Sequence, residues 1–210
     1  MTGSSILPVA IHNSKLYFLF GKENSLERSA PGYSDFGGGI EKGESELDTA
    51  IREGSEELTG FLGTPDQIKK HIKSAGGTFS FSKMNADNSK KQYTVHVVKY
   101  PYDPVMTKYY NNNHSFLWDK MNRPFLKSTK LFEKIEIDWF CEDELKKRMS
   151  EYRPFYREVV NLLLEKMPEI KKFIKKSGPK GTRRIKESKR NRRNYNKTQS
   201  RRRVKKMKGG

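Results

Sequence analysis

The pattern of apolar positions along the chain predicts five β-strands. The first two are expected at residues 6–11 and 16–20, with the polar residues 12–14 between them as a hairpin turn. A second pair is expected at residues 78–83 and 92–100, joined by a polar loop. The fifth strand is expected at residues 135–140.

Helical periodicity is clearest behind a run of three glycines. At about 100° per residue, one stripe of the helix carries small and apolar residues, and the opposite side carries acidic ones. The apolar stripe comprises Leu47, Ala50, Ile51, Gly54 and Leu58. Ser45 is the expected N-cap, with Asp48 three residues later, so the helix is predicted to begin after Glu44 and to end near Gly60.

The remaining predicted helices cover residues 67–74, 142–148 and 154–176, and Pro168 is expected to kink the last of them. Residues 103–130 show no clear periodicity. They are predicted to form a long loop with about one helical turn, and a loop of this length is usually functional or disordered.

Charge divides the 210 residues into two parts. Residues 171–210 carry 19 of the 43 basic residues and one of the 25 acidic residues, which leaves 24 of each in the rest. We therefore predict a domain at residues 1–170 and a basic tail at 171–210, where a helix end is followed by disorder because large apolar residues are scarce.

The natural partner of such a tail is a polyanion, and nucleic acid is the first candidate. A nuclear address and a solubilising appendage are the alternatives. The expected RNA contacts are Arg183, Arg184, Arg192, Arg193, Arg201, Arg202 and Arg203.

Cys141 is the only cysteine, so an intrachain disulfide is excluded and a reducing compartment is expected. No signal peptide is visible and no apolar run approaches membrane-spanning length. We expect an intracellular protein, cytoplasmic in the first place and nuclear if the tail is an address.

The acidic side of the helix at 45–58 is the main candidate for chemistry. Glu53, Glu56 and Glu57 share it, and Glu44 lies at the helix start beside the glycines. Like charges at this spacing repel unless a cation neutralises them, and carboxylate oxygens suit Mg²⁺ or Mn²⁺. The alternative is a solvated acidic face without a ligand.

The pattern G-x5-E-x7-R-E-x2-E-E, from Gly38 to Glu57, resembles the signature of the Nudix hydrolases. The resemblance implies an α/β/α sandwich with a mixed sheet and metal-dependent hydrolysis of a nucleoside diphosphate linked to another moiety. Two positions depart from the family pattern. Gly54 stands where an aliphatic residue is usual, and two residues, Leu58 and Thr59, separate the last glutamate from Gly60, where the family usually has one.

The resemblance also implies roles for the motif residues. Glu56 and Glu57 would be metal ligands, Glu57 and Glu53 would belong to the catalytic centre, and Glu53 would ligate the metal or activate water. Arg52 would orient the glutamates through ion pairs. A backbone carbonyl of Gly37 or Gly38 would complete the metal site.

The resemblance further implies one more carboxylate, as a metal ligand or base, just before the strand that contains Trp139. Glu133 is the first choice and Glu136 the second, although both could be ordinary surface acids. For a substrate base, Tyr33 and Phe36 are the first stacking candidates and Phe116 and Trp118 further ones, with core packing as the alternative. The candidate phosphate contacts are Lys127 and Lys130.

The leading functional hypothesis is an mRNA-decapping Nudix hydrolase, similar to the type found in large DNA viruses. It would cleave the cap triphosphate bridge and release 7-methylguanosine diphosphate (m7GDP) and 5′-monophosphate RNA. The alternatives are a pyrophosphatase for diphosphoinositol polyphosphates, dinucleoside polyphosphates or nucleotides, and an RNA-binding module on a Nudix shell.

Overall fold

The structure is a computed structural model, and it describes residues 2–24, 31–129 and 133–176. The tail arginines and Lys130 lie outside these ranges. The described chain forms a seven-stranded mixed sheet. Its strands are β1 (Gly3–His12), β2 (Lys15–Glu23), β3 (Tyr33–Ser34), β4 (Phe36–Gly39), β5 (Phe79–Met84), β6 (Lys91–Lys99) and β7 (Lys134–Cys141).

Strand β1 lies at the centre of the sheet. It pairs in parallel with β6 on one edge, and its other edge is shared between β2 and β4, which are both antiparallel to it. Only Asp35 separates strands β3 and β4. Strand β3 pairs with β2, and strand β4 pairs with β1. This arrangement holds the glycines of β4 beside the start of β1.

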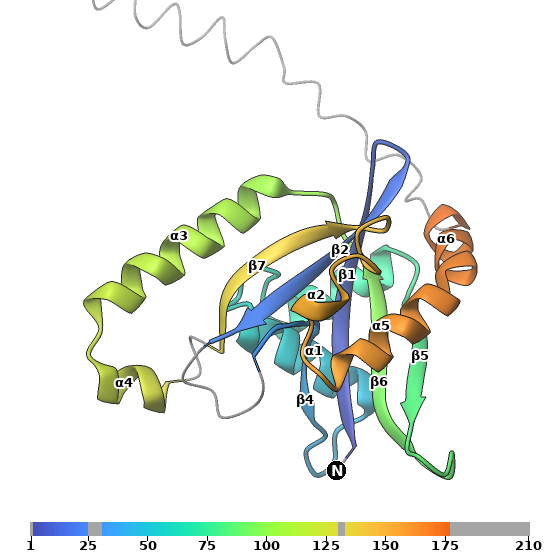
Figure 1. The fold of residues 1–210 in the computed structure, drawn as a ribbon, viewed down its shortest axis with the longest axis horizontal. Helices are drawn as coiled ribbons and strands as arrows, with labels where there is room; N and C mark the ends of the chain where they lie inside the picture. Colours follow the sequence, from blue (N-terminus) through green and yellow to red (C-terminus); the bar gives the residue numbers. More distant parts are fainter. Residues whose placement is uncertain (1, 25–30, 130–132, 177–210) are drawn as a thin grey trace, which may run out of the picture. The chain divides into compact units, whose positions relative to one another are not determined.

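Helices cover both faces of the sheet (Figure 1). They are α1 (Glu46–Glu57), α2 (Pro65–Ser74), α3 (Pro104–Lys120), α4 (Arg123–Ser128), α5 (Tyr156–Glu165) and α6 (Met167–Lys176). Successive residues of a strand point to opposite faces, and β1 shows this clearly. Ile6 and Ala10 join the core under α1 and α2, whereas Leu7 and Val9 join the core under α5 and α6. The predicted α/β/α sandwich with a mixed sheet is confirmed.

Helix α1 has the predicted boundaries. The backbone N–H of Asp48 donates to the Ser45 hydroxyl at 3.1 Å, and Leu58 is the C-cap. Thr59 and Gly60 then adopt positive φ angles of 47° and 77°, which turn the chain away from the helix.

Gly54 has a packing role. A Cβ atom at this position would lie 2.3 Å from Cγ2 of Ile6 on β1. The missing side chain therefore lets α1 approach the sheet closely, which explains this departure from the usual aliphatic residue.

The five predicted strands and the helix at 67–74 are confirmed, and their ends differ from the predicted ones by at most three residues. Near Pro168, the predicted kink is a break at Lys166 between α5 and α6. Ile170 and Ile174 of α6 are buried in the core, so the compact part of the chain continues beyond residue 170.

The prediction of a loop at 103–130 was wrong, because this segment contains α3 and α4. The Asp103 side chain accepts hydrogen bonds from the N–H groups of Val105 and Met106, and Pro104 occupies the first turn. Tyr110 anchors the buried side of α3, and its hydroxyl lies 2.9 Å from the carbonyl oxygens of both Glu57 and Lys134.

The predicted α-helix at 142–148 was also wrong. This segment consists of turns, followed by a short 3₁₀ helix at Met149–Glu151. Cys141 ends β7 as a buried free thiol. Among the described helices, none is long and apolar enough to cross a membrane.

Candidate functional site

The glycines of β4 lie directly against the acidic side of α1. A Cβ atom at Gly38 would lie 2.4 Å from Oε1 of Glu53. Only glycine therefore allows the Glu53 carboxylate to approach the strand this closely. The predicted metal-site carbonyls of Gly37 and Gly38 belong to the same strand.

Arg52 is held between two carboxylates. Its Nε and Nη2 atoms donate to the two oxygens of Glu44 at 2.7 and 3.0 Å, and its Nη1 donates to Glu53 at 2.7 Å. Hydrogen bonds from Arg52 and from Thr49 lower the pKa of Glu44 to about 2. The guanidinium thus fixes the direction of Glu53 through a bidentate contact with Glu44.

Glu57 is the buried member of the acidic side, with 6% of its surface exposed. Its Oε2 accepts from the N–H of Gly37 at 3.0 Å, and its Oε1 lies 3.3 Å from Nζ of Lys134. Burial raises the pKa of Glu57 to about 8; Lys134 acts against this, and the charges of Glu23, Glu133 and Glu53 add to it. Negative charge is therefore crowded around this carboxylate.

The other predicted acids have different surroundings. Glu56 is partly exposed and lies 3.6 Å from Nη1 of Arg52. Glu133 lies in a bend just before β7, close enough for its charge to act on Glu57. Glu136 instead accepts a hydrogen bond from the Tyr33 hydroxyl at 2.9 Å and lies 3.5 Å from Nζ of Lys22. Between the two alternatives, Glu133 is the one brought near the acidic helix.

These residues suit a hard divalent cation by the chemistry of their donors. Carboxylate oxygens of Glu53 and Glu57 lie against the glycine strand β4, and repulsion around Glu57 would be relieved by added positive charge. Within the described ranges, no three acidic, histidine or cysteine side chains converge closely enough to form a ligand cluster.

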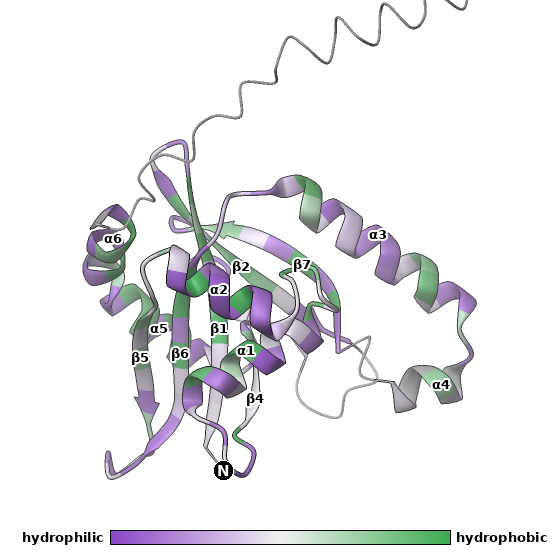
Figure 2. Cartoon of the chain, turned by 180° about the vertical axis from the view of Figure 1, so that it is seen from behind, coloured by the Kyte–Doolittle hydropathy of each residue, from purple (hydrophilic) through white to green (hydrophobic). Residues whose placement is uncertain are grey.

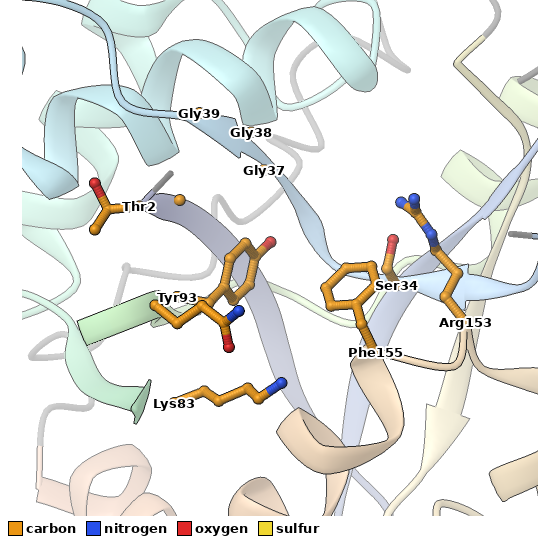
Figure 3. Close-up of a pocket in the computed structure, with 11 residues that line it drawn as sticks. Thr2, Ser34, Gly37, Gly38, Gly39, Lys83, Tyr93, Arg153 and Phe155 are labelled. Atoms are coloured by element: carbon orange, nitrogen blue, oxygen red, sulfur yellow. The ribbon is translucent and has the colours of Figure 1, made fainter. Parts of the chain in front are cut away.

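A pocket of about 350 Å³ lies beside the same glycine strand. Tyr93, Lys83, Arg153 and Phe155 surround it, with Gly37–Gly39 along one side (Figure 3). The guanidinium of Arg153 lies 4.9 Å from the centre of the Phe155 ring, and Lys83 forms a 2.9 Å ion pair with Glu158. Gly38 therefore touches the Glu53 carboxylate and also lines the pocket.

Two predicted stacking residues are in the core instead. Phe36 is fully buried and packs in the layer under α1. Tyr33 is 4% exposed and packs against Phe140. The prediction that these rings bind a substrate base was wrong, because neither presents a face to a ligand. Nothing is described for the side chain of Lys127, which lies in α4.

Several residues near the acidic helix were not expected from the sequence. Lys134 is buried, forms an ion pair with Glu23 and lies 3.1 Å from the Ser34 hydroxyl. Arg153 pairs with Glu23 as well. Glu23 and Lys134 lie just outside the predicted strands at 16–20 and 135–140, and the strands extend to include them. Their only signal in the sequence was this position beside apolar strands, since such residues are rarely buried without a partner.

No protein-family model matches the chain, and no curated protein matches it in sequence. Comparison with solved structures finds a Nudix hydrolase from M. smegmatis, RenU, at 11% identity, over 81% of this chain and 88% of that one, with a TM-score of 0.48. The Ap4A hydrolase of C. elegans aligns at 15% identity over 81% and 99%, with a TM-score of 0.44. The NUDIX domain of Shewanella oneidensis NrtR, solved with ADP ribose, aligns at 10% identity over 81% and 87%, with a TM-score of 0.40.

Proposed function

We propose that this chain is a metal-dependent Nudix pyrophosphohydrolase that removes the cap from RNA. The observation that carries the proposal is the position of the Gly38 strand, which touches the Glu53 carboxylate on one side and a nucleotide-sized pocket on the other. A phosphate bridge held at this strand would lie between a water-activating acid and a binding site for a nucleoside.

Glu53, Glu56 and Glu57 would hold Mg²⁺ or Mn²⁺ together with a carbonyl of Gly37 or Gly38, and Glu133 would supply a further carboxylate. The bound cation would neutralise phosphate charge and lower the pKa of a coordinated water. Arg52, itself fixed by Glu44, orients the Glu53 carboxylate, which would accept the proton of the water.

In the proposed reaction, the water oxygen forms a bond to phosphorus and the P–O bond to the neighbouring bridging oxygen breaks. The bridging oxygen leaves with one product, and the two products are m7GDP and RNA with a 5′-monophosphate. Phe155, which is half exposed, offers a ring for the cap base, and Lys83 and Arg153 offer positive charge for its phosphates.

A long anionic substrate is favoured by the charge distribution. The first 170 residues hold equal numbers of acidic and basic residues, and the excess positive charge belongs to the last forty. Binding of a free nucleotide would not require such a segment, whereas RNA offers many phosphates to it.

The test is turnover of RNA labelled in the cap, with Mg²⁺ or Mn²⁺ present. Release of labelled m7GDP by the wild type, and loss of release in Glu56→Gln, are expected. Glu46→Gln serves as the matched control, because Glu46 belongs to the same helix and pairs with the exposed Lys91.

Two other outcomes would contradict decapping. Turnover of small pyrophosphates alone would identify one of the alternative pyrophosphatases. Retention of capped RNA without cleavage under both metals would identify an RNA-binding module and would also remove the hydrolase assignment.

A further inference from the structure

Helix α3 carries a line of apolar side chains on its outward side. Tyr109 and Phe116 are 64% and 61% exposed, and Val105 is 53% exposed. At 100° per residue, these three positions fall within a 40° arc, on the opposite side from the buried Tyr110 and His114. We name Tyr109 and Phe116, together with the exposed Phe125 of α4, the aromatic face.

The aromatic face is not needed to attach α3 to the domain. The attachment is made on the other side, where the Asn111 side chain exchanges two hydrogen bonds with the backbone of Ile137 at 3.1 and 2.8 Å. Tyr110 adds its contacts with the carbonyls of Glu57 and Lys134. Exposed apolar side chains aligned on one side of a helix, unlike single scattered ones, are typical of a binding surface.

Positive charge accompanies the aromatic face. Residues 104–128 contain four basic residues and one acidic residue, Asp119. Lys108 and Lys120 are exposed on α3, and the ammonium of Lys120 lies 5.9 Å from the centre of the Phe116 ring. Hydrophobic and hydrophilic residues are interspersed along α3 and α4 (Figure 2).

We propose that the aromatic face binds single-stranded RNA by stacking its rings on successive or nearby bases. Rings interleaved with lysine and asparagine suit this ligand, because bases stack on aromatic side chains while lysines neutralise the phosphates. A helix that docks in a protein groove uses apolar anchors at i, i+3 or i+4, and i+7, and between Tyr109 and Phe116 the intermediate anchor positions are Asn112 and Asn113.

The proposal gives RNA a second contact region that is fixed to the acidic helix. Tyr110 ties α3 to the end of α1 at Glu57 and to the start of β7 at Lys134. RNA held on α3 would therefore be anchored at a constant position relative to the acidic side of α1. The proposal concerns binding and does not depend on the hydrolysis proposed above.

The experiment measures binding of a fluorescent, uncapped oligouridylate to the full-length chain in EDTA, so that no cap chemistry takes part. The double variant Tyr109→Ala/Phe116→Ala is expected to raise the Kd about tenfold or more, since each stacked base contributes measurably. The conservative pair Tyr109→Phe/Phe116→Tyr is expected to bind like the wild type, because both retain a ring.

Ile11→Ala is the matched control, because Ile11 is an exposed apolar residue on β1 and lies outside the aromatic face. Salt separates stacking from the charge of the tail: the alanine variants should keep the wild-type salt dependence, while Lys108→Gln/Lys120→Gln should flatten it. An unchanged Kd in Tyr109→Ala/Phe116→Ala at raised salt would overturn the proposal. An unchanged Kd accompanied by a shift in oligomeric state would assign the face to a second copy of the chain and would overturn it too.

Discussion

At the scale of single residues, charge balance distinguishes Glu57 from Glu53. Glu57 is buried beside the ammonium of Lys134, whereas Glu53 is held by the guanidinium of Arg52. Removing one partner from a buried pair costs about 3–5 kcal/mol, because the remaining charge is left uncompensated. Lys134 therefore has a structural role, and Arg52 is the residue whose loss should affect turnover in particular.

Arg52→Lys tests this role. A lysine ammonium cannot hold both oxygens of Glu44 while also reaching Glu53, since it lacks the planar fork of arginine. Misplacement of a catalytic group costs up to about 10²-fold in rate, so kcat for a cap dinucleotide should fall by that order while KM changes little. Arg157→Lys, which alters an arginine bonded to backbone carbonyls near α5, is the control. A wild-type kcat in Arg52→Lys would show that Glu53 does not need this positioning.

Phe155→Ala tests the pocket. Loss of one stacking ring is worth about 1–3 kcal/mol, so KM for a cap dinucleotide should rise at least about fivefold with kcat largely kept. Phe155→Tyr should restore KM, and Met84→Ala, at an exposed apolar position of β5, should leave it unchanged. If KM stayed at the wild-type value in Phe155→Ala, the substrate base would have to bind elsewhere.

His96 gives a pH-dependent contribution to stability. Its side chain is buried, Nδ1 lies 2.8 Å from the Ser80 hydroxyl, and burial lowers the pKa of the imidazole below its ordinary 6.5. As the pH falls below about 6.5, His96 binds a proton in the unfolded chain but stays neutral in the folded chain. The free energy of unfolding therefore decreases. His96→Gln should lack this decrease in urea unfolding between pH 7 and pH 5. Parallel pH profiles for the two proteins would contradict the effect.

At the scale of elements, local sequence patterns predicted those helices and strands that have a single buried side. The α1 boundaries follow from Ser45 and from the offsets of the acidic residues. The pattern failed for α3, because exposed rings at Tyr109 and Phe116 spread apolar residues around the helix. Asp103 and Pro104 were the visible start signal, a capping residue followed by proline.

The site was predictable to the same extent. The residues that share α1 have a fixed spacing, so their common side could be read from the sequence. The ion pairs of Glu23 with Lys134 and Arg153 join β2, β7 and the segment before α5. Local periodicity in the sequence does not predict such long-range contacts. The core positions of Tyr33 and Phe36 likewise depend on how β3 and β4 insert beside β1 and β2.

The packing of α1 on β1 yields a prediction about Gly54. Gly54→Ala should gain about 1 kcal/mol in helix propensity but lose about 1–3 kcal/mol through the clash with Ile6, so a net decrease in stability is expected. On an Ile6→Ala background the clash is absent, and Gly54→Ala should be stabilising. Urea unfolding of the four proteins in this cycle measures the coupling. Additive effects would show that the helix does not depend on this close approach.

At the scale of the whole molecule, the acidic side of α1 and a strongly basic segment belong to one chain with a net charge of +18. Attraction of a polyanion and binding of a cation require opposite charges, and the chain separates them along its sequence. Affinity for long RNA and chemistry at the phosphate bridge should therefore be separable by truncation.

Deleting residues 177–210 removes 15 basic residues and one acidic residue. For capped RNA of many nucleotides, KM should rise and its dependence on salt should flatten, because fewer phosphates are neutralised and fewer counterions are released. For a cap dinucleotide, kcat and KM should stay close to the wild type, since the described site lies within residues 2–176. The aromatic face should give the truncated protein a residual affinity for RNA, and this affinity should depend only weakly on salt. Equal losses on the long and the short substrate would instead mean that the last residues support the domain itself.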